Sequence, residues 1–233
     1  QQMEKLQEVA GKQEMLMGAL AHEMKTPLTS IIGYSDTLRH VKLNDEQKDR
    51  ALEHISREGK RLEKLSGKML QMLGLHQNDS IKMESHSIGE LLEHVVQLEA
   101  EQAAQRQIQL QTEYEDFSMK MDDELMESLL VNLIDNALRA PEAGGRITVK
   151  AYKESGRKIL EVADNGRGIP QEELGKITEA FYMVDKSRSR QEGGAGLGLA
   201  LCVKIAEVHG GRLDITSQLG TGTKVRVIFD KKR

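Results

Sequence analysis

A histidine followed by an acidic residue and a proline is the feature of this sequence best suited to covalent chemistry. His22 precedes Glu23, and Thr26 and Pro27 follow about one helical turn later. An exposed imidazole with an ordinary pKa of about 6.5 is largely neutral at physiological pH and can act as a nucleophile. Glu23 could accept its proton, although adjacent helix residues face one another only with a favourable rotamer or a bend, which Pro27 could supply. We therefore expect His22 to be a nucleophile.

Three glycine-rich segments have the composition of loops that approach a phosphorylated ligand. Residues 164–168 read Asp-Asn-Gly-Arg-Gly, residues 193–198 read Gly-Gly-Ala-Gly-Leu-Gly, and residues 220–223 read Gly-Thr-Gly-Thr. Glycine lets backbone amides come close to a phosphate, and a helix N-terminus favours an anion. Each cluster by itself is more often an ordinary loop, and neither P-loop spacing nor the dinucleotide-binding pattern is present.

Two asparagines could complete such a site. Asn132 and Asn136 are four residues apart on a predicted helix, so their side chains share a face. Two amide oxygens on one face could hold Mg²⁺ together with nucleotide phosphates. Two solvated asparagines without a ligand are the alternative that the pair alone leaves open.

The composition argues against several other kinds of site. With 33 basic and 37 acidic residues the net charge is −4, so we expect no nucleic-acid partner. The single cysteine, Cys202, permits no intrachain disulfide and no cysteine-rich zinc site. No run of the sequence approaches the length of an apolar membrane span, so we expect no membrane contact within this fragment.

The first part of the chain must present His22, and its pattern predicts two long helices with a break near residues 41–44. The first helix has the three–four spacing of a heptad seam, formed by Met3, Leu6, Ala10, Met17, Leu20, Met24, Leu28, Ile31 and Leu38. A hairpin of two such helices leaves its seam half exposed, so we expect a homodimer that forms a four-helix bundle, with His22 facing away from the seam. A hairpin that packs only on its own second domain is the alternative.

The rest of the chain must hold the glycine segments, and in it strands alternate with helices. Helices are predicted at 88–106, 122–140 and 196–209, and strands at 107–112, 147–152, 159–163, 213–216 and 225–229. This order predicts an α/β sandwich with helices over one face of a mixed sheet. The expected fold class is therefore α+β, with one domain at 1–76, a second at 80–233 and a hinge near 75–80.

Five ordered motifs give the chain a resemblance to the sensor histidine kinases of two-component systems. Residues 21–28 look like the H-box of that family, and residues 132–137 resemble its N-box. Residues 164–168, 181–182 and 194–199 are similar to the G1, F and G2 boxes. The resemblance implies a dimerisation and phosphotransfer hairpin, a Bergerat-type ATP-binding domain that uses ATP and Mg²⁺, and a response-regulator receiver domain whose aspartate accepts the phosphoryl group.

The resemblance also implies a role for each matching residue. His22 would be phosphorylated, Glu23 would be its acid–base partner, and Thr26 would orient water when the protein dephosphorylates its regulator. The residues implied to bind the nucleotide are Asn132, Asn136, Arg139, Asp164, Gly166, Gly168, Tyr182, Lys186, Arg188, Arg190, Gly194, Gly196, Leu197, Gly198 and Thr223. Among them, Asn136 and Asn132 would hold Mg²⁺, Asp164 would accept a hydrogen bond from the adenine amino group, and residues 181–196 would form a lid.

Two other functions stay open at this point. One is an ATPase machine of the gyrase or chaperone kind, or a protein-serine kinase, which would lack the His22 cluster on a dimeric hairpin. The other is a scaffold that binds a receiver domain without catalysis, which the asparagines and Asp164 argue against. The chain begins at Gln1 within a helical pattern, so we interpret it as a cytoplasmic fragment of a longer protein, which we expect by analogy to be anchored in the cell membrane.

Overall fold

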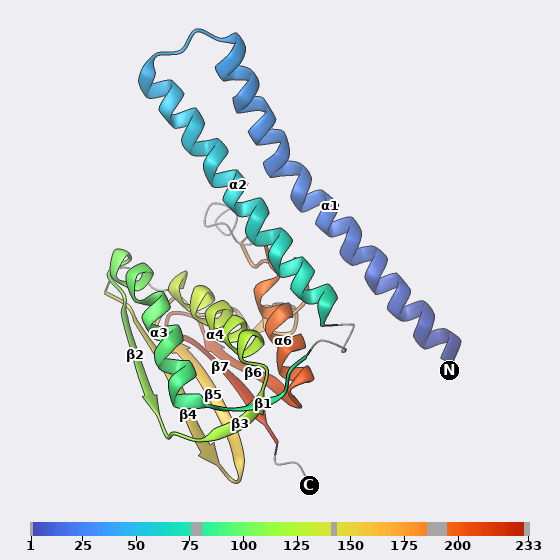
Figure 1. Ribbon diagram of the computed structural model, residues 1–233, viewed down its shortest axis with the longest axis vertical. Coiled ribbons are helices and arrows are strands. Elements are labelled where there is room, and N and C mark those ends of the chain that lie inside the picture. The colour runs from blue at the N-terminus through green and yellow to red at the C-terminus, as the bar shows by residue number, and fades with distance from the viewer. Residues whose placement is uncertain (1, 76–80, 141–143, 186–194, 231–233) are drawn as a thin grey trace. The chain divides into compact units, whose positions relative to one another are not determined.

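The computed structural model describes residues 2–75, 81–140, 144–185 and 195–230 of the chain (Figure 1). They form two compact units, a helical hairpin made of α1 and most of α2, and an α/β unit that begins at Gln71. Helix α1 spans Gln2–His40 and helix α2 spans Asp45–Gly74. Among the described residues, no helix combines the length and the apolar composition that crossing a membrane requires.

The loop between the two long helices ends in a reciprocal cap. The Asn44 side chain accepts a hydrogen bond from the Gln47 backbone amide at 2.8 Å, and the Gln47 side chain accepts one from the Asn44 amide at 3.0 Å. This exchange satisfies two of the amides that a helix N-terminus leaves without a partner, as in a capping box. The predicted break near residues 41–44 is thereby confirmed. Helix α1 continues through Pro27.

Apolar side chains on α1 remain exposed in the single chain. Met17, Met24 and Leu28 belong to the predicted heptad seam and are 50%, 38% and 50% exposed. Ile32, one turn beyond Leu28, is 52% exposed. Two copies of a hairpin would bury such a stripe in a four-helix bundle. The homodimer stays a prediction, and the exposed apolar side chains of α1 are the surface at which it can be tested.

The second unit is built on a mixed sheet of five strands in the order β2-β4-β5-β7-β6. The strands are β2 (Gln109–Tyr114), β4 (Arg146–Glu154), β5 (Arg157–Asp164), β6 (Gly211–Gln218) and β7 (Gly222–Phe229). Strands β2 and β4 pair in parallel, whereas the other neighbours are antiparallel. Helices α3 (Ile88–Gln105), α4 (Asp123–Leu138) and α6 (Gly198–Val208) cover one face of this sheet (Figure 1). This is the predicted sandwich.

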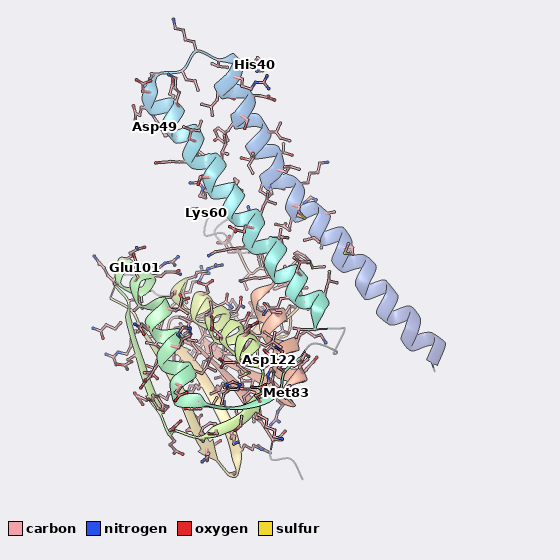
Figure 2. All side chains as sticks on the ribbon, in the orientation of Figure 1. His40, Asp49, Lys60, Met83, Glu101 and Asp122 are labelled. Atoms are coloured by element: carbon pink, nitrogen blue, oxygen red, sulfur yellow. The ribbon has the colours of Figure 1, made fainter. Side chains whose placement is uncertain are left out.

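Smaller elements complete the α/β unit. Strands β1 (Glu84–Ser87) and β3 (Ser118–Met121) pair as a separate two-stranded sheet that the sequence did not predict. A short 3₁₀ helix, η1, spans Gln171–Glu173. The Asp122 side chain, labelled in Figure 2, caps α4 by accepting a hydrogen bond from the Leu125 amide at 3.1 Å. Strand β1 leads directly into α3, and strand β3 leads into α4.

The two faces of the sheet differ as their alternating side chains require. Ile147, Val149 and Ala151 of β4 are at most 1% exposed. They belong to the face that packs under α4, whose Leu129 and Ile134 are fully buried. Burial of such side chains contributes about 1.5–3 kcal/mol each and provides most of the stability of this unit.

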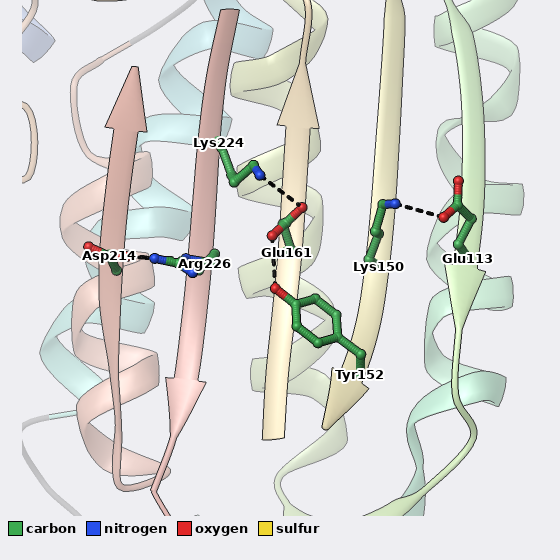
Figure 3. Close-up of polar contacts among 7 residues, drawn as sticks. All are labelled: Glu113, Lys150, Tyr152, Glu161, Asp214, Lys224 and Arg226. Carbon is green, nitrogen blue, oxygen red and sulfur yellow. Dashed lines mark hydrogen bonds and ion pairs between the residues drawn. The ribbon is translucent and has the colours of Figure 1, made fainter. Parts of the chain in front are cut away.

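The face of the sheet opposite the helices carries a row of cross-strand ion pairs (Figure 3). Its three pairs are Lys150 with Glu113 at 2.7 Å, Lys224 with Glu161 at 3.8 Å, and Arg226 with Asp214. Tyr152 also donates a hydrogen bond to Glu161 at 3.0 Å. Opposite charges on neighbouring strands favour this register.

Candidate functional site

His22 is exposed on α1, as the heptad register predicts. Thr26, one turn later on the same side of the helix, is also exposed, whereas Pro27 is buried. The imidazole is therefore accessible to a reagent from outside the hairpin. This exposure satisfies the steric condition for a nucleophile at this position.

Glu23 is held differently from its neighbour. Its side chain is 8% exposed, and its Oε2 atom lies 3.4 Å from a terminal nitrogen of Arg61 on α2. Arg61 is also 3.7 Å from Glu58, so one guanidinium serves two carboxylates. A buried ion pair is strongly destabilised when one partner is removed, so Glu23 is tied to α2. Any proton transfer between Glu23 and His22 would have to occur from within this pair.

Asn132 and Asn136 face the N-terminus of α6. A side-chain carbon added at Gly198 would lie 3.3 Å from the Asn132 Oδ1 atom and 3.5 Å from the Asn136 Nδ2 atom. The Asn132 amide nitrogen donates to the Ser128 carbonyl oxygen at 2.7 Å. Within the described part of the chain, however, Asn132 Oδ1 and Asn136 Nδ2 are buried without a hydrogen-bond partner. Such atoms carry a desolvation cost that a ligand would relieve, so the pair fits a bound cation or phosphate.

The amide oxygens of the two asparagines could contribute to a cation site. Among the residues that the structure describes, no group of three or more His, Cys, Asp or Glu side chains could hold a metal ion. A Mg²⁺ ion at this place would therefore depend on the asparagine amides and on phosphate oxygens of a bound nucleotide.

Asp164 stands at the end of β5 as a partly buried carboxylate. Its Oδ1 atom accepts a hydrogen bond from the Gly166 amide at 2.8 Å. Burial raises the pKa of Asp164 above its ordinary value of 3.8, while hydrogen bonds from the backbone of Gly166 and Thr223 act in the opposite direction. Thr223 pairs with Asp164 across β5 and β7. A carboxylate with residual hydrogen-bonding capacity in such a place can accept a bond from an amino group of a ligand.

Gly168 allows the loop after β5 to pass close to another segment. It has φ +72°, and an added side-chain carbon would lie 2.1 Å from the Gln218 carbonyl oxygen. Only glycine adopts this backbone conformation without strain in so little space. The same loop is close to the end of α4, since a carbon added at Gly166 would lie 2.5 Å from the Ala140 carbonyl carbon.

The two ends of the predicted lid lie together. The Phe181 amide donates a hydrogen bond to the Gly196 carbonyl oxygen at 2.8 Å, and Phe181 has φ 66°. Gly196 has φ +69°, so α6 begins at Gly198 rather than at the predicted residue 196. Tyr182 donates a hydrogen bond to Glu173, and this bond raises the pKa of the Tyr182 hydroxyl.

The remaining predicted nucleotide residues fall into two groups. Leu197 is 1% exposed at the start of α6, and Arg139 caps the C-terminus of α4 with its guanidinium 3.9 Å from Asp135. Lys186, Arg188, Arg190 and Gly194 lie outside the described residues. The α/β unit thus brings the ends of α4 and β5 together with the starts of β7 and α6. His22, Glu23 and Thr26 belong to the hairpin unit.

Sequence reasoning missed the buried partner of Glu23. Arg61 lies four residues before Leu65 and eight before Met69, and all three side chains are buried on α2. A charged residue in register with an apolar stripe was the available signal, because such a residue is rarely buried without a partner. The identity of that partner depends on the approach of α1 and could not be read from either helix alone.

Two family models match separate parts of the chain. The His Kinase A (phospho-acceptor) domain matches residues 12–73. The model described as histidine kinase-, DNA gyrase B- and HSP90-like ATPase matches residues 121–233. The two matches follow one another in the order of the hairpin and the α/β unit.

Curated relatives extend this similarity over nearly the whole chain. Sensor histidine kinase YkoH of Bacillus subtilis is 34% identical over 228 residues, which cover 97% of this chain and 50% of the relative. Signal transduction histidine-protein kinase ArlS of Staphylococcus aureus is 30% identical over 240 residues, covering 97% of this chain and 51% of that protein. The chain therefore spans about half the length of these relatives.

Solved structures show the same fold. The Acinetobacter baumannii histidine kinase AdeS matches with a TM-score of 0.70 and 21% identity, covering 91% of this chain and 98% of that one. Full-length ShkA in complex with AMPPNP matches with a TM-score of 0.68 and 26% identity, over 93% and 45% of the two chains. Histidine kinase ThkA in complex with response regulator protein TrrA matches with a TM-score of 0.76 and 22% identity, over 100% and 67%.

Proposed function

Because the chain belongs to the sensor histidine kinases, we propose that it transfers the γ-phosphoryl group of ATP to His22 and then to an aspartate of a response regulator. The observation that carries this proposal is the pair of buried, unpartnered amide atoms of Asn132 and Asn136 beside Gly198. A nucleotide with its metal ion would supply the partners that these atoms lack. The AMPPNP bound to ShkA supports ATP as the ligand.

The first step of the reaction is nucleophilic substitution at phosphorus. A neutral imidazole nitrogen of His22 attacks the γ-phosphorus, the bond between that phosphorus and the β,γ-bridging oxygen breaks, and ADP leaves. Glu23, the next residue in sequence, would take the proton from the other ring nitrogen. The imidazole ring of the phosphohistidine then carries no positive charge. Transfer of this kind depends mostly on positioning and on charge stabilisation.

The α/β unit would orient the nucleotide through its own residues. Asp164 would accept a hydrogen bond from the adenine amino group, and Arg139 would neutralise phosphate charge. Asn132 and Asn136 would hold Mg²⁺, which when bound supplies further neutralisation of the phosphate oxygens. Lys186, Arg188 and Arg190 would add positive charge from the lid.

In the second step, a receiver-domain carboxylate attacks the phosphorus of the phosphohistidine and the bond to the imidazole nitrogen breaks. The complex of ThkA with its response regulator supports a partner of this class. We also propose that the protein removes the phosphoryl group from its regulator, with Thr26 orienting the attacking water. Thr26→Ala should then reduce dephosphorylation and leave autophosphorylation intact, and an unchanged dephosphorylation rate would disprove this role.

We propose further that the active form is a homodimer on the cytoplasmic side of the cell, with the exposed seam of α1 at the dimer interface. The exposed apolar side chains of Met17, Met24 and Leu28 support this arrangement. A longer parent protein anchored in the membrane would add the sensor, as the half-length match to its relatives suggests.

Incubation with γ-labelled ATP and Mg²⁺ tests the kinase directly. The protein should acquire a label that is labile in acid and stable in alkali, as expected of a phosphoramidate. His22→Gln should abolish the label. His40→Gln is the matched control, because His40 is an exposed histidine on the same helix. Label that persists unchanged in the His22 variant would refute the assignment.

A further inference from the structure

The last turn of α4 is the part of the proposed nucleotide site that other elements must hold in place. It carries Asn136, and Arg139 and Ala140 follow directly. The last carbonyls of a helix have no partner within the helix, and a helix C-terminus favours a nearby cation. The last turn of Asp123–Leu138 contains no basic residue. Arg139 follows as the C-cap residue with its guanidinium 3.9 Å from Asp135, and a second cation comes from another element.

Arg106, which follows α3, provides this cation. Its NH1 nitrogen donates a hydrogen bond to the Leu138 carbonyl oxygen at 2.9 Å; Arg106 is partly buried and Leu138 is buried. The residues are 32 positions apart in sequence, so the contact fixes the end of one helix against the end of another. A charge-assisted hydrogen bond of this kind is stronger than a neutral one.

Gln102 makes a second contact from the same face of α3, one turn before Arg106. Its amide nitrogen donates to the Asp135 Oδ1 atom at 3.2 Å. The other oxygen of Asp135 lies 3.9 Å from the Arg139 guanidinium. A carboxylate near a helix C-terminus is unfavourable by itself, so these two partners offset its cost. Gln102 thereby fixes the orientation of the Asp135 carboxylate, which faces Arg139.

The same turn of α4 is linked to the loop after β5. The Arg167 amide donates to the Ala140 carbonyl oxygen at 3.3 Å, and Gly166 leaves no room for a side chain beside Ala140. A shift at the end of α4 would therefore move Asn136 and also disturb the loop that follows Asp164. Displacements of about 1 Å in such positions can cost on the order of a hundredfold in rate or affinity.

We propose that Gln102 and Arg106 are positioning residues that hold the last turn of α4 in the orientation that binds the phosphates of ATP. Neither touches the nucleotide, and both act through Asp135, Arg139 and the end of α4. The matched ranges 12–73 and 121–233 leave these two residues outside both family models. This inference rests on the proposed function, because it takes ATP as the ligand of the α4 turn.

Calorimetric titration of the full chain with AMPPNP and Mg²⁺ tests the role of Arg106. Arg106→Met should raise the dissociation constant roughly 5- to 20-fold, because the α4 turn loses the Arg106 charge and its hydrogen bond to the Leu138 carbonyl oxygen. Arg106→Lys should restore affinity to within about threefold, because an ammonium can donate to the same carbonyl oxygen. Autophosphorylation should show a raised KM for ATP. Its kcat should stay within about twofold of the wild type, because a saturating ATP concentration fills the weakened site.

Gln102→Leu tests the second contact against a matched control. Gln105 is an exposed glutamine on the same helix whose side chain donates a hydrogen bond to Glu101 of that helix at 3.2 Å. Gln102→Leu should weaken AMPPNP binding about 3- to 10-fold, and Gln105→Leu should leave it unchanged.

Thermal unfolding of each variant separates positioning from general stability. Unchanged AMPPNP affinity in folded Arg106→Met and Gln102→Leu proteins would overturn the inference, even if their Tm falls, and would leave the proposed function standing. A wild-type protein that binds no AMPPNP would overturn the proposed function and this inference with it.

Discussion

Glu23 and Arg61 form a buried ion pair that joins α1 to α2, with Oε2 of Glu23 and a terminal nitrogen of Arg61 separated by 3.4 Å. Both side chains are 8% exposed, although His22 beside Glu23 is exposed. The proposed nucleophile, His22, is therefore in contact with solvent, whereas its proposed proton acceptor, Glu23, is buried, although the two residues are adjacent. The pair also makes the geometry around His22 dependent on how α2 lies against α1.

Removal of one partner of this pair should destabilise the hairpin. We expect Arg61→Met to lower the free energy of unfolding by about 3 kcal/mol, because the Glu23 carboxylate loses the guanidinium that faces it while buried. Adding Glu23→Gln should recover part of the loss, since a neutral amide costs less to bury. Urea denaturation of the hairpin-containing full chain measures both changes.

The matched control is an exposed pair on the same helix. Arg50 and Glu46 lie 2.9 Å apart with side chains 63% and 77% exposed. Arg50→Met should change the free energy of unfolding by less than about 1 kcal/mol. Equal stabilities of the Arg61 and Arg50 variants would contradict the structural importance of the buried pair.

Asp164→Asn should separate nucleotide binding from stability. Burial raises the folded-state pKa of Asp164, so above that pKa the ionised carboxylate costs folding free energy. An amide removes this cost and still accepts the Gly166 hydrogen bond, so stability at pH 7 should be unchanged or increased. Affinity for AMPPNP should fall roughly 10- to 100-fold, because the amide also presents donors to the adenine amino group.

Asp214→Asn provides the comparison for Asp164. Asp214 pairs with Arg226 on the face of the sheet opposite the helices (Figure 3). Its replacement should leave AMPPNP affinity unchanged. Full affinity in the Asp164 variant would remove this carboxylate from the nucleotide site.

His209 should make the stability of the α/β unit dependent on pH. One ring nitrogen, Nδ1, is 2.7 Å from the Ile205 carbonyl oxygen, and the other, Nε2, accepts a hydrogen bond from the Asp122 amide at 3.0 Å. A carbonyl can only accept and an amide can only donate, so the ring is neutral with its proton on Nδ1. Burial lowers the pKa of His209 below 6.5, although the nearby Asp122 carboxylate opposes this.

Because the pKa of His209 is lower in the folded state, the α/β unit should be less stable at acidic pH. The unfolded chain binds a proton at His209 more readily than the folded chain does, so the contribution of the neutral ring is complete above about pH 6.5. It is lost as the pH falls below that value toward the lower folded-state pKa. Urea denaturation at several pH values should show this loss in the wild type and a smaller one in His209→Gln. Identical profiles for the two proteins would contradict the prediction.

Leu28→Glu should disrupt the predicted homodimer. Leu28 is half exposed in the single chain and would be buried by the second copy, where a carboxylate without a partner is costly. We expect the dimer dissociation constant to rise at least roughly 100-fold, as measured by sedimentation equilibrium. Leu98→Glu, on α3 at 52% exposure, should leave the dimer intact. A dimer of unchanged affinity in the Leu28 variant would exclude this face as the interface.

Local patterns predicted much of this architecture. The β4–β5 hairpin was predicted around Ser155 and Gly156, which have φ values of 53° and 79° and thus the conformation that a tight primed turn requires. The helix predicted at 88–106 is α3 at Ile88–Gln105. These elements depend on residues close in sequence, whose propensities and spacing are visible in the chain itself.

Contacts between distant residues could not be predicted in this way. Strands β1 and β3 have only four residues each and gain their partner from across the fold. The parallel pairing of β2 with β4, the bond from Arg106 to Leu138 and the bond from Gln102 to Asp135 likewise join segments about 30 residues apart. The resemblance implied a nucleotide contact for Gly168, which stays a prediction. The close approach of Gly168 to the Gln218 carbonyl oxygen is a further long-range contact that the sequence could not show.

Mapping of the phosphoryl group by tandem mass spectrometry shows which residue accepts it from ATP. After incubation with ATP and Mg²⁺ under neutral or alkaline handling, we expect a phosphoryl group on the imidazole of His22 and none there in Asn136→Ala protein. Release of ADP without a phosphoprotein, or a phosphoryl group on another residue while His22 stays unmodified, would contradict this expectation.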